Sequence, residues 1–279
     1  MDRGDVTAKR PIALTIAGSD SGGGAGAQAD LRTFAAMGVY GASAITALTA
    51  QNTLGVRLVH VPPPGVLLAQ IEAVLEDFNV VAIKIGMLAN AANVSAVARA
   101  LIGDALHRAR APFVALDPVL RASSGDALGD DGLAAAIADT LLVRVDCLTP
   151  NLAEAAALLD CEIAADEAEM RRQGEALLER GPRAVLMKGG HLPGDEAVDW
   201  LVTHAGARRY AAPRLASRAG HGTGCTLSSA IAAGIASGRD LSDAVGAAKA
   251  LVSASIARGG AHRLGEGEGP LLQLALGAH

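Results

Sequence analysis

The chain has 279 residues, of which 51% are hydrophobic and only 2% aromatic, and its formal net charge is −5. This composition excludes an intrinsically disordered chain, and the scarcity of aromatic side chains argues against stacking on single-stranded nucleic acid. The mild negative charge also argues against a nucleic-acid or anionic-membrane partner.

Residues 1–10 form a polar tail without the apolar stretch of a signal peptide. Beyond it, short apolar runs alternate with helical periodicity. The expected strands are 11–17, 42–50, 56–60, 80–86, 113–116, 147–149 and 184–187, followed by an antiparallel pair, 197–203 and 208–211. The expected helices are 27–37, 66–76, 92–102, 132–142, 152–159, 167–179, 222–237 and 241–257, with a glycine-rich loop at 258–269 before a short last helix.

This alternation predicts an α/β fold with a mostly parallel central sheet and helices on both faces. No low-complexity linker, charge block or repeat divides the chain, so we expect a single domain over residues 1–279. Two long segments, 33–56 and 219–238, lack formal charges but contain Gly, Ser and Thr. We therefore expect buried strand and helix there, and no membrane span.

Polar and glycine residues follow the expected strands repeatedly. In parallel α/β folds, ligands bind beyond the carboxyl ends of the strands. The pattern therefore predicts one site at that edge of the sheet. Its candidate residues are Gly18, Ser19, Asp20, Gln51, Asn52, Gly86, Met87, Asp117, Thr149, Asn151, Lys188 and Gly189.

The glycine-rich loop after the first strand has three interpretations. Gly24 to Ala29 read GAGAQA, which fits the loose dinucleotide fingerprint, but no acidic residue for a ribose occurs between Leu31 and Gly55. A plain flexible turn is the second interpretation. We favour a loop whose glycines let the backbone approach a bound substrate, with Asp20 and Asp30 as polar groups near it. A P-loop motif is absent from the sequence.

Gly222, Thr223, Gly224 and Cys225 open an expected helix of small residues. Exposed amides and the helix dipole would favour a phosphate or a developing phosphoryl charge there. In the first turn of a helix the pKa of the Cys225 thiol should fall, which would make the thiolate more reactive. Helix capping with a buried structural cysteine is the alternative.

Asn151 and Glu154 can be a capping box or the carboxylate side of a nucleotide–Mg²⁺ site, reached through water. Lys188, at a strand end before two glycines, suits neutralising a triphosphate; a solvated surface lysine is the alternative. Of the histidines, only His221 is a functional candidate. The three cysteines, with no CxxC pair, predict neither a disulfide framework nor a zinc site and fit a reducing cytoplasm.

Taken together, these motifs resemble the hydroxymethylpyrimidine/phosphomethylpyrimidine kinases of thiamine biosynthesis, in the ribokinase superfamily. The similarity covers residues 11–270. It is strongest in ALTIAGSDSGGGAGAQADLRTF (13–34), ITALTAQNTLGV (45–56), IKIGML (83–88), LTPNLAEAAALL (148–159), VLMKGGH (185–191) and HGTGCTLSSAIAA (221–233).

The resemblance implies a three-layer α/β/α sandwich, usually a homodimer, that uses ATP and Mg²⁺. It also implies two successive phosphorylations, of the hydroxymethyl group of 4-amino-5-hydroxymethyl-2-methylpyrimidine and then of the monophosphate. Cys225 takes the place of a catalytic Asp in most ribokinase relatives, and with Gly222, Thr223, Gly224 and Lys188 forms the catalytic set. The pyrimidine-contacting Gln corresponds to Gln51, and the other substrate-pocket positions are Gly18, Asp20, Ala25, Thr49 and Met87. The nucleotide positions are Asp117, Asn151, Glu154, Lys188 and Gly222, with Glu154 and Asp117 on the Mg²⁺ side through water.

Two alternatives remain open: a pyridoxal or pyridoxine kinase, and a non-catalytic pyrimidine-binding sensor that keeps the fold. The chain also departs from the family at two positions. Ser123 stands where the family has a Lys, with Arg121 as a candidate to supply the charge, and Gly220 stands where it has a Thr. These departures concern the nucleotide loops and leave the expected reaction class unchanged.

Overall fold

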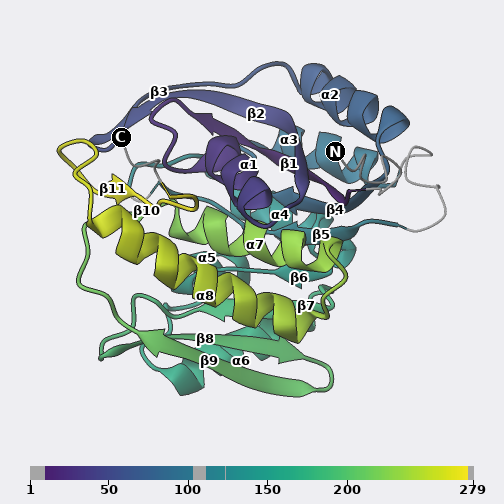
Figure 1. The fold of residues 1–279 in the computed structure, drawn as a ribbon. Coiled ribbons are helices and arrows are strands. Elements are labelled where there is room, and N and C mark those ends of the chain that lie inside the picture. The colour runs from purple at the N-terminus through teal and green to yellow at the C-terminus, as the bar shows by residue number, and fades with distance from the viewer. Residues whose placement is uncertain (1–9, 103–110, 123, 276–279) are drawn as a thin grey trace, which may run out of the picture.

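The computed structural model describes residues 10–102, 111–122 and 124–275 (Figure 1). Within them, a nine-stranded sheet has the order β3-β2-β1-β4-β5-β6-β7-β8-β9. Neighbours from β2 through β7 are parallel, and the β2–β3, β7–β8 and β8–β9 pairs are antiparallel. The strands are β1 (Ile12–Asp20), β2 (Tyr40–Asn52), β3 (Gly55–His60), β4 (Val80–Ile85), β5 (Phe113–Leu116), β6 (Cys147–Leu148), β7 (Ala184–Lys188), β8 (Glu196–Thr203) and β9 (Gly206–Pro213).

Helices cover both faces of this sheet, which confirms the expected three-layer α/β/α arrangement (Figure 1). One layer consists of α1 (Gly26–Ala36), α7 (Thr223–Ala236) and α8 (Leu241–Gly260). The other consists of α2 (Pro64–Asp77), α3 (Ala91–Ala100), α4 (Leu133–Thr140), α5 (Leu152–Leu159) and α6 (Glu167–Leu178), with a 3₁₀ turn, η2 (Leu142–Arg144), after α4.

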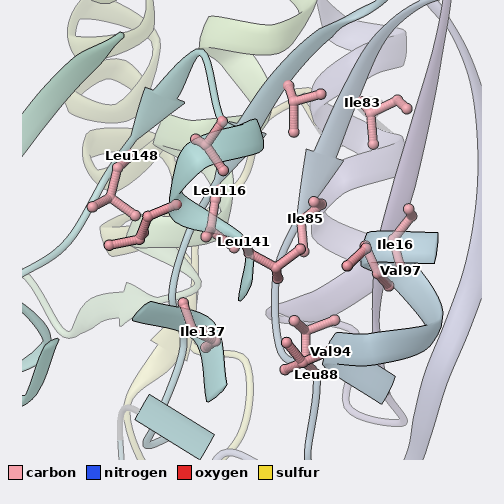
Figure 2. Close-up of a cluster of buried hydrophobic side chains, with 14 of the residues drawn as sticks. Ile16, Ile83, Ile85, Leu88, Val94, Val97, Leu116, Ile137, Leu141 and Leu148 are labelled. Atoms are coloured by element: carbon pink, nitrogen blue, oxygen red, sulfur yellow. The ribbon is translucent and has the colours of Figure 1, made fainter. Parts of the chain in front are cut away.

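The two faces of the sheet carry side chains of different size. Ala13, Ala82 and Ala115 point toward α1 and α7, and these short side chains let both helices lie close to the strands. Large aliphatic residues such as Ile16 and Ile85 alternate with them and pack against α3 and α4 (Figure 2). Alternation along each strand therefore produces a thin layer on the α1/α7 side and a deep apolar core on the other.

The structure differs from the expected elements mainly near the chain end. Residues Ala219–His221 form β10, which pairs in parallel with β11 (Gly269–Pro270). These strands are too short to leave a recognisable alternation in the sequence. The expected short last helix is wrong as far as the described chain extends, because residues 270–275 contain no helix. Within the described residues, every helix is too short or too polar to span a bilayer.

Candidate active site

A cavity of about 670 Å³ opens at the carboxyl edge of the parallel strands. The strand-end candidates Asn52, Gly86, Thr149 and Gly189 do not line it. Every residue that the family resemblance assigned to the site does line it. These residues are Gly18, Asp20, Ala25, Thr49, Gln51, Met87, Asp117, Asn151, Glu154, Lys188, Gly222, Thr223, Gly224 and Cys225. Because parallel strands end at one edge, side chains up to about 200 residues apart in sequence meet there.

Asp20 organises the glycine-rich loop between β1 and α1. Its two carboxylate oxygens accept hydrogen bonds from the amides of Gly22 (2.8 Å) and Ala25 (2.9 Å). His221 lies 2.9 Å from the same carboxylate through Nε2. Burial raises the pKa of Asp20, but the hydrogen bonds from His221 and from the two amides outweigh burial and hold this pKa below its usual value. Asp20 is therefore an ionised anchor that joins this loop to the chain just before α7.

Gln51 and Thr49 on β2 form the polar part of the cavity wall near that loop. The Thr49 hydroxyl lies 3.0 Å from the carbonyl of Ser19 and 3.1 Å from Gln51 Oε1. Gly18 lies against Met87, since a Cβ on Gly18 would be 2.8 Å from the Met87 sulfur. The wall thus combines one amide and one hydroxyl with a thioether, a combination suited to a flat heteroaromatic ring.

The start of α7 has the geometry of an anion site. Gly222 is the N-cap residue, with φ 90°, and a Cβ there would collide with the carbonyl of Gly24. Only glycine adopts this conformation readily. The first amides of the helix, from Thr223 to Cys225, have no intrahelical acceptor and carry the positive end of the helix dipole.

Lys188, Asp117 and Glu154 form a charged cluster beside that helix start. Lys188 Nζ lies 2.6 Å from Asp117 Oδ1 and 3.7 Å from Glu154 Oε2. Burial alone would lower the pKa of Lys188, but Asp117 and Glu154 raise it above its usual value. A Cβ on Gly224 would lie 3.0 Å from Lys188 Nζ, so the helix start directly adjoins this ammonium group.

Asn151 and Glu154 form a complete capping box at the start of α5. The Asn151 side chain accepts from the Glu154 amide at 2.9 Å, and Glu154 Oε2 accepts from the Asn151 amide at 2.7 Å. Burial raises the pKa of Glu154 to about 7, with Lys188 opposing and Asp117 reinforcing this rise. The capping interpretation is thus confirmed, and the same carboxyl group also faces the cavity.

The structure contradicts the expected low pKa of Cys225. Part of its surface faces the cavity, but its enclosure by the cavity walls raises the pKa of the thiol to about 11. Lys84 lowers this pKa, Asp30 and Asp117 raise it, and a hydrogen bond from the Gly26 amide lowers it. Desolvation is the largest of these effects, and the sequence does not reveal it.

The family model for phosphomethylpyrimidine kinase matches residues 20–272. A hydroxymethylpyrimidine/phosphomethylpyrimidine kinase of Rhizobium meliloti is 51% identical over 93% of this chain and 96% of the relative. The chain belongs to the phosphomethylpyrimidine kinase family.

Among solved structures, a phosphomethylpyrimidine kinase of Clostridium difficile is similar, with a TM-score of 0.76 and 39% identity over 88% of this chain and 100% of the other. The Staphylococcus aureus pyridoxal kinase in complex with ADP has a TM-score of 0.85 and 29% identity, covering 95% and 94% of the two chains. These neighbours confirm the expected ribokinase-like fold.

Gly220, which stands where the family has a Thr, lies against the side chain of Glu268. A Cβ on Gly220 would collide with the carboxylate of Glu268, which also lines the cavity. Glu268 therefore occupies the space that a larger residue at position 220 would need. The other departure, Ser123, lies outside the described residues; its neighbour Arg121 lines the cavity and donates to the Gly125 carbonyl at 3.1 Å.

Sequence reasoning missed Lys84 and misplaced Asp30. Asp30 does not line the cavity; it is fully buried and paired with Lys84, whose Nζ lies 2.8 Å from Asp30 Oδ2. The available signal was a lysine near the end of an otherwise apolar strand. A second missed pair, Asp199 with Lys249 at 2.6 Å, also lies on the cavity wall. Nothing in the sequence links those two residues across the 50 positions between them.

Proposed function

We propose that this phosphomethylpyrimidine kinase family member transfers a phosphoryl group from ATP to the hydroxymethyl group of 4-amino-5-hydroxymethyl-2-methylpyrimidine, and then a second one to the monophosphate, for thiamine biosynthesis. One observation carries the proposal: the amide and hydroxyl of Gln51 and Thr49 share a single cavity with the anion-binding start of α7 and Lys188. An acceptor and a triphosphate held there would bring the acceptor hydroxyl close to the γ-phosphorus, which phosphoryl transfer requires.

The chain's own residues can position and neutralise the reacting groups. The amides at residues 223–225 would hold the transferring phosphoryl group, and Lys188 would offset its charge. In the first transfer the thiolate form of Cys225, which is the minor form of this buried group, would accept the hydroxyl proton. In the second, the acceptor is an anionic phosphate oxygen that needs no strong base. A neutral thiol at position 225 also avoids the repulsion that a fixed carboxylate would exert on that acceptor.

We propose ATP with Mg²⁺ as the phosphoryl donor. The ADP-bound pyridoxal kinase neighbour supports a nucleotide in this fold. The carboxylates of Asp117 and Glu154 are hard oxygen donors, which fit Mg²⁺ held mainly by phosphates and water. The described residues contain no group of three metal-ligating side chains, so a metal bound through water and the nucleotide suits this site better than a protein cage. When bound, Mg²⁺ would neutralise charge on the phosphates.

The test is an ATP-consumption assay with the hydroxymethylpyrimidine and with pyridoxal, the products being identified by mass. We expect the pyrimidine monophosphate and then the diphosphate. If only pyridoxal is phosphorylated, the protein is a vitamin B6 kinase. This is the second candidate function, which the similarity to pyridoxal kinase structures favours. Pyrimidine binding without ATP consumption would identify a non-catalytic sensor.

The proposed role of Cys225 is tested by measuring both transfers separately. We expect Cys225→Ala to slow the first transfer at least tenfold, within the usual contribution of a general base, and to leave the second nearly unchanged. Cys225→Asp should keep the first transfer and slow the second through charge repulsion. A wild-type rate for the first transfer in both variants would eliminate the base role.

We also propose a homodimer that buries an apolar face of the β2–β3 pair. Leu48 and Leu58 are 49% and 60% exposed, and the register places them on the same face of the hairpin, opposite Thr49. A second copy of this chain would remove that area from water. Light scattering should give twice the chain mass, and Leu58→Asp should give a monomer. A monomeric wild-type protein would refute this interface.

We propose a reducing, cytoplasmic location, which the three free thiols support. Cys147, Cys161 and Cys225 are unpaired, and Cys161 is exposed. Fractionation of cells producing the full chain, with thiol labelling of the cytoplasmic fraction, tests this proposal; recovery of the protein outside the cytoplasm would contradict it.

A further inference from the structure

Lys84 and Asp30 form an ion pair that is completely shielded from solvent. Lys84 Nζ donates to both carboxylate oxygens of Asp30, at 2.9 and 2.8 Å. Thr15 Oγ1 donates to Asp30 at 2.6 Å and Ser229 Oγ donates at 2.7 Å. The carboxylate therefore connects β1, β4, α1 and α7 at a single point.

Stability alone does not explain this pair. Two buried charges lose their hydration, and replacing such a pair with apolar side chains of similar volume is often neutral or stabilising. The neighbouring strand positions on this face are alanines, Ala13, Ala82 and Ala115. A charged pair inserted among small apolar residues beside a catalytic cavity indicates a role in that cavity.

The register of α1 and α7 places the pair directly beneath Cys225. The Gly26 amide hydrogen-bonds to Cys225, and four residues later on each helix Asp30 accepts from Ser229. Residues four apart lie on one face of a helix, one turn or roughly 5 Å apart along the axis. The two helices thus meet in two layers, with Gly26 and Cys225 above Asp30 and Ser229.

Lys84 extends toward the upper layer. Its ammonium group carries three donors, two of which are accounted for by the bonds to Asp30. Nζ lies 2.8 Å from the position of a Cβ on Gly86, the residue just before Met87 at the cavity wall. The cation therefore lies at the floor of the same cavity that Cys225 lines, where its charge acts on the thiol.

We propose that Lys84 is a positioning residue whose ammonium group stabilises the thiolate of Cys225 and so assists the first phosphoryl transfer. In that step the acceptor hydroxyl proton passes to the Cys225 sulfur, the acceptor oxygen bonds to phosphorus, and the bond from phosphorus to the bridging oxygen of ADP breaks. The charges that face the thiol are Lys84 from β4, Asp30 from α1 and Asp117 after β5. The proposal rests on the base role of Cys225 for its kinetic part only.

Thiol alkylation measures the interaction between Lys84 and Cys225 independently of kinase activity. In a Cys161→Ser background, which removes the exposed thiol, the rate of iodoacetamide addition to Cys225 is followed by mass spectrometry at fixed pH. We expect Lys84→Met to slow the reaction and Asp30→Asn to accelerate it. A nearby charge shifts a pKa by about one unit or more, and one unit changes the fraction of thiolate about tenfold. The nucleophilicity of the thiolate changes in the opposite direction, so the alkylation rate should change about threefold.

The double variant Lys84→Met/Asp30→Asn leaves no buried charge unpaired, so it serves if a single variant fails to fold. Since Lys84 acts on Cys225 more strongly than Asp30 does, we expect this variant to react more slowly than the parent. Unchanged rates, or shifts of the two single variants in the same direction, would overturn the proposal. The ratio of first to second transfer should fall in Lys84→Met. If the two single variants shift the alkylation rate in opposite directions but Lys84→Met leaves the ratio of first to second transfer unchanged, Cys225 is not the base. The electrostatic interaction between Lys84 and Cys225 would then still stand.

Discussion

Replacing Glu154 with Gln should make the stability of the protein less sensitive to pH. Glu154 is 6% exposed, and burial raises the pKa of its carboxyl group from 4.5 to about 7. The folded protein then holds this proton more tightly than the unfolded chain does. The resulting stabilisation is complete below pH 4.5 and is lost as the pH rises through about 7. At 1.36 kcal/mol per unit, the loss is at most about 3 kcal/mol.

The Gln side chain keeps an acceptor for the Asn151 amide and cannot ionise. We therefore expect Glu154→Gln to match the wild type near pH 4 and to exceed it by up to about 3 kcal/mol at pH 8. The assay is urea unfolding at several pH values, without nucleotide and with a chelator. Glu72→Gln, at an exposed position on α2, is the matched control and should give no pH-dependent difference. A constant difference between Glu154→Gln and the wild type across this range would refute the argument from burial.

Two glycine substitutions extend these predictions. Gly222→Ala should lower the free energy of unfolding by about 1–2 kcal/mol, because alanine is strained in the left-handed backbone conformation of this position. It should also reduce the transfer rate by up to about 100-fold, since displacement of the α7 amides misaligns the phosphate. A variant with the wild-type rate would contradict this expectation. Gly220→Thr should raise the KM for ATP and destabilise the fold by roughly 1–3 kcal/mol through overpacking against Glu268. Adding Glu268→Ala to this variant should restore most of the lost stability and of the affinity for ATP, measured by thermal unfolding and by kinetics. If neither is restored, Glu268 is not what collides with the threonine.

The sequence was sufficient to predict many of the residues that meet at the cavity, but not Lys84, Asp199 or Lys249. Strand–helix alternation implies a parallel sheet, and parallel strands bring their carboxyl ends to one edge. Asp117 and Lys188, 71 positions apart, were therefore both expected there, and their 2.6 Å contact agrees. The capping box of Asn151 and Glu154 was also readable, because it depends on residues only three positions apart.

Only the tertiary structure decided how the cavity is charged. The resemblance placed Asp20 in the pocket, but its link to His221 spans 201 positions, and no local pattern encodes it. The same holds for Lys84 and Asp30, which meet through the packing of α1 on the sheet. The glycine-capped start of α7 was expected from Gly222 and its neighbours, and its phosphate-binding role stays a prediction. The pKa of Cys225 was expected to fall and instead rises to about 11. The order of residues along the chain determines which groups lie at the carboxyl edge of the sheet. Desolvation and long-range contacts determine whether those groups are protonated, and both depend on how the folded protein encloses each group.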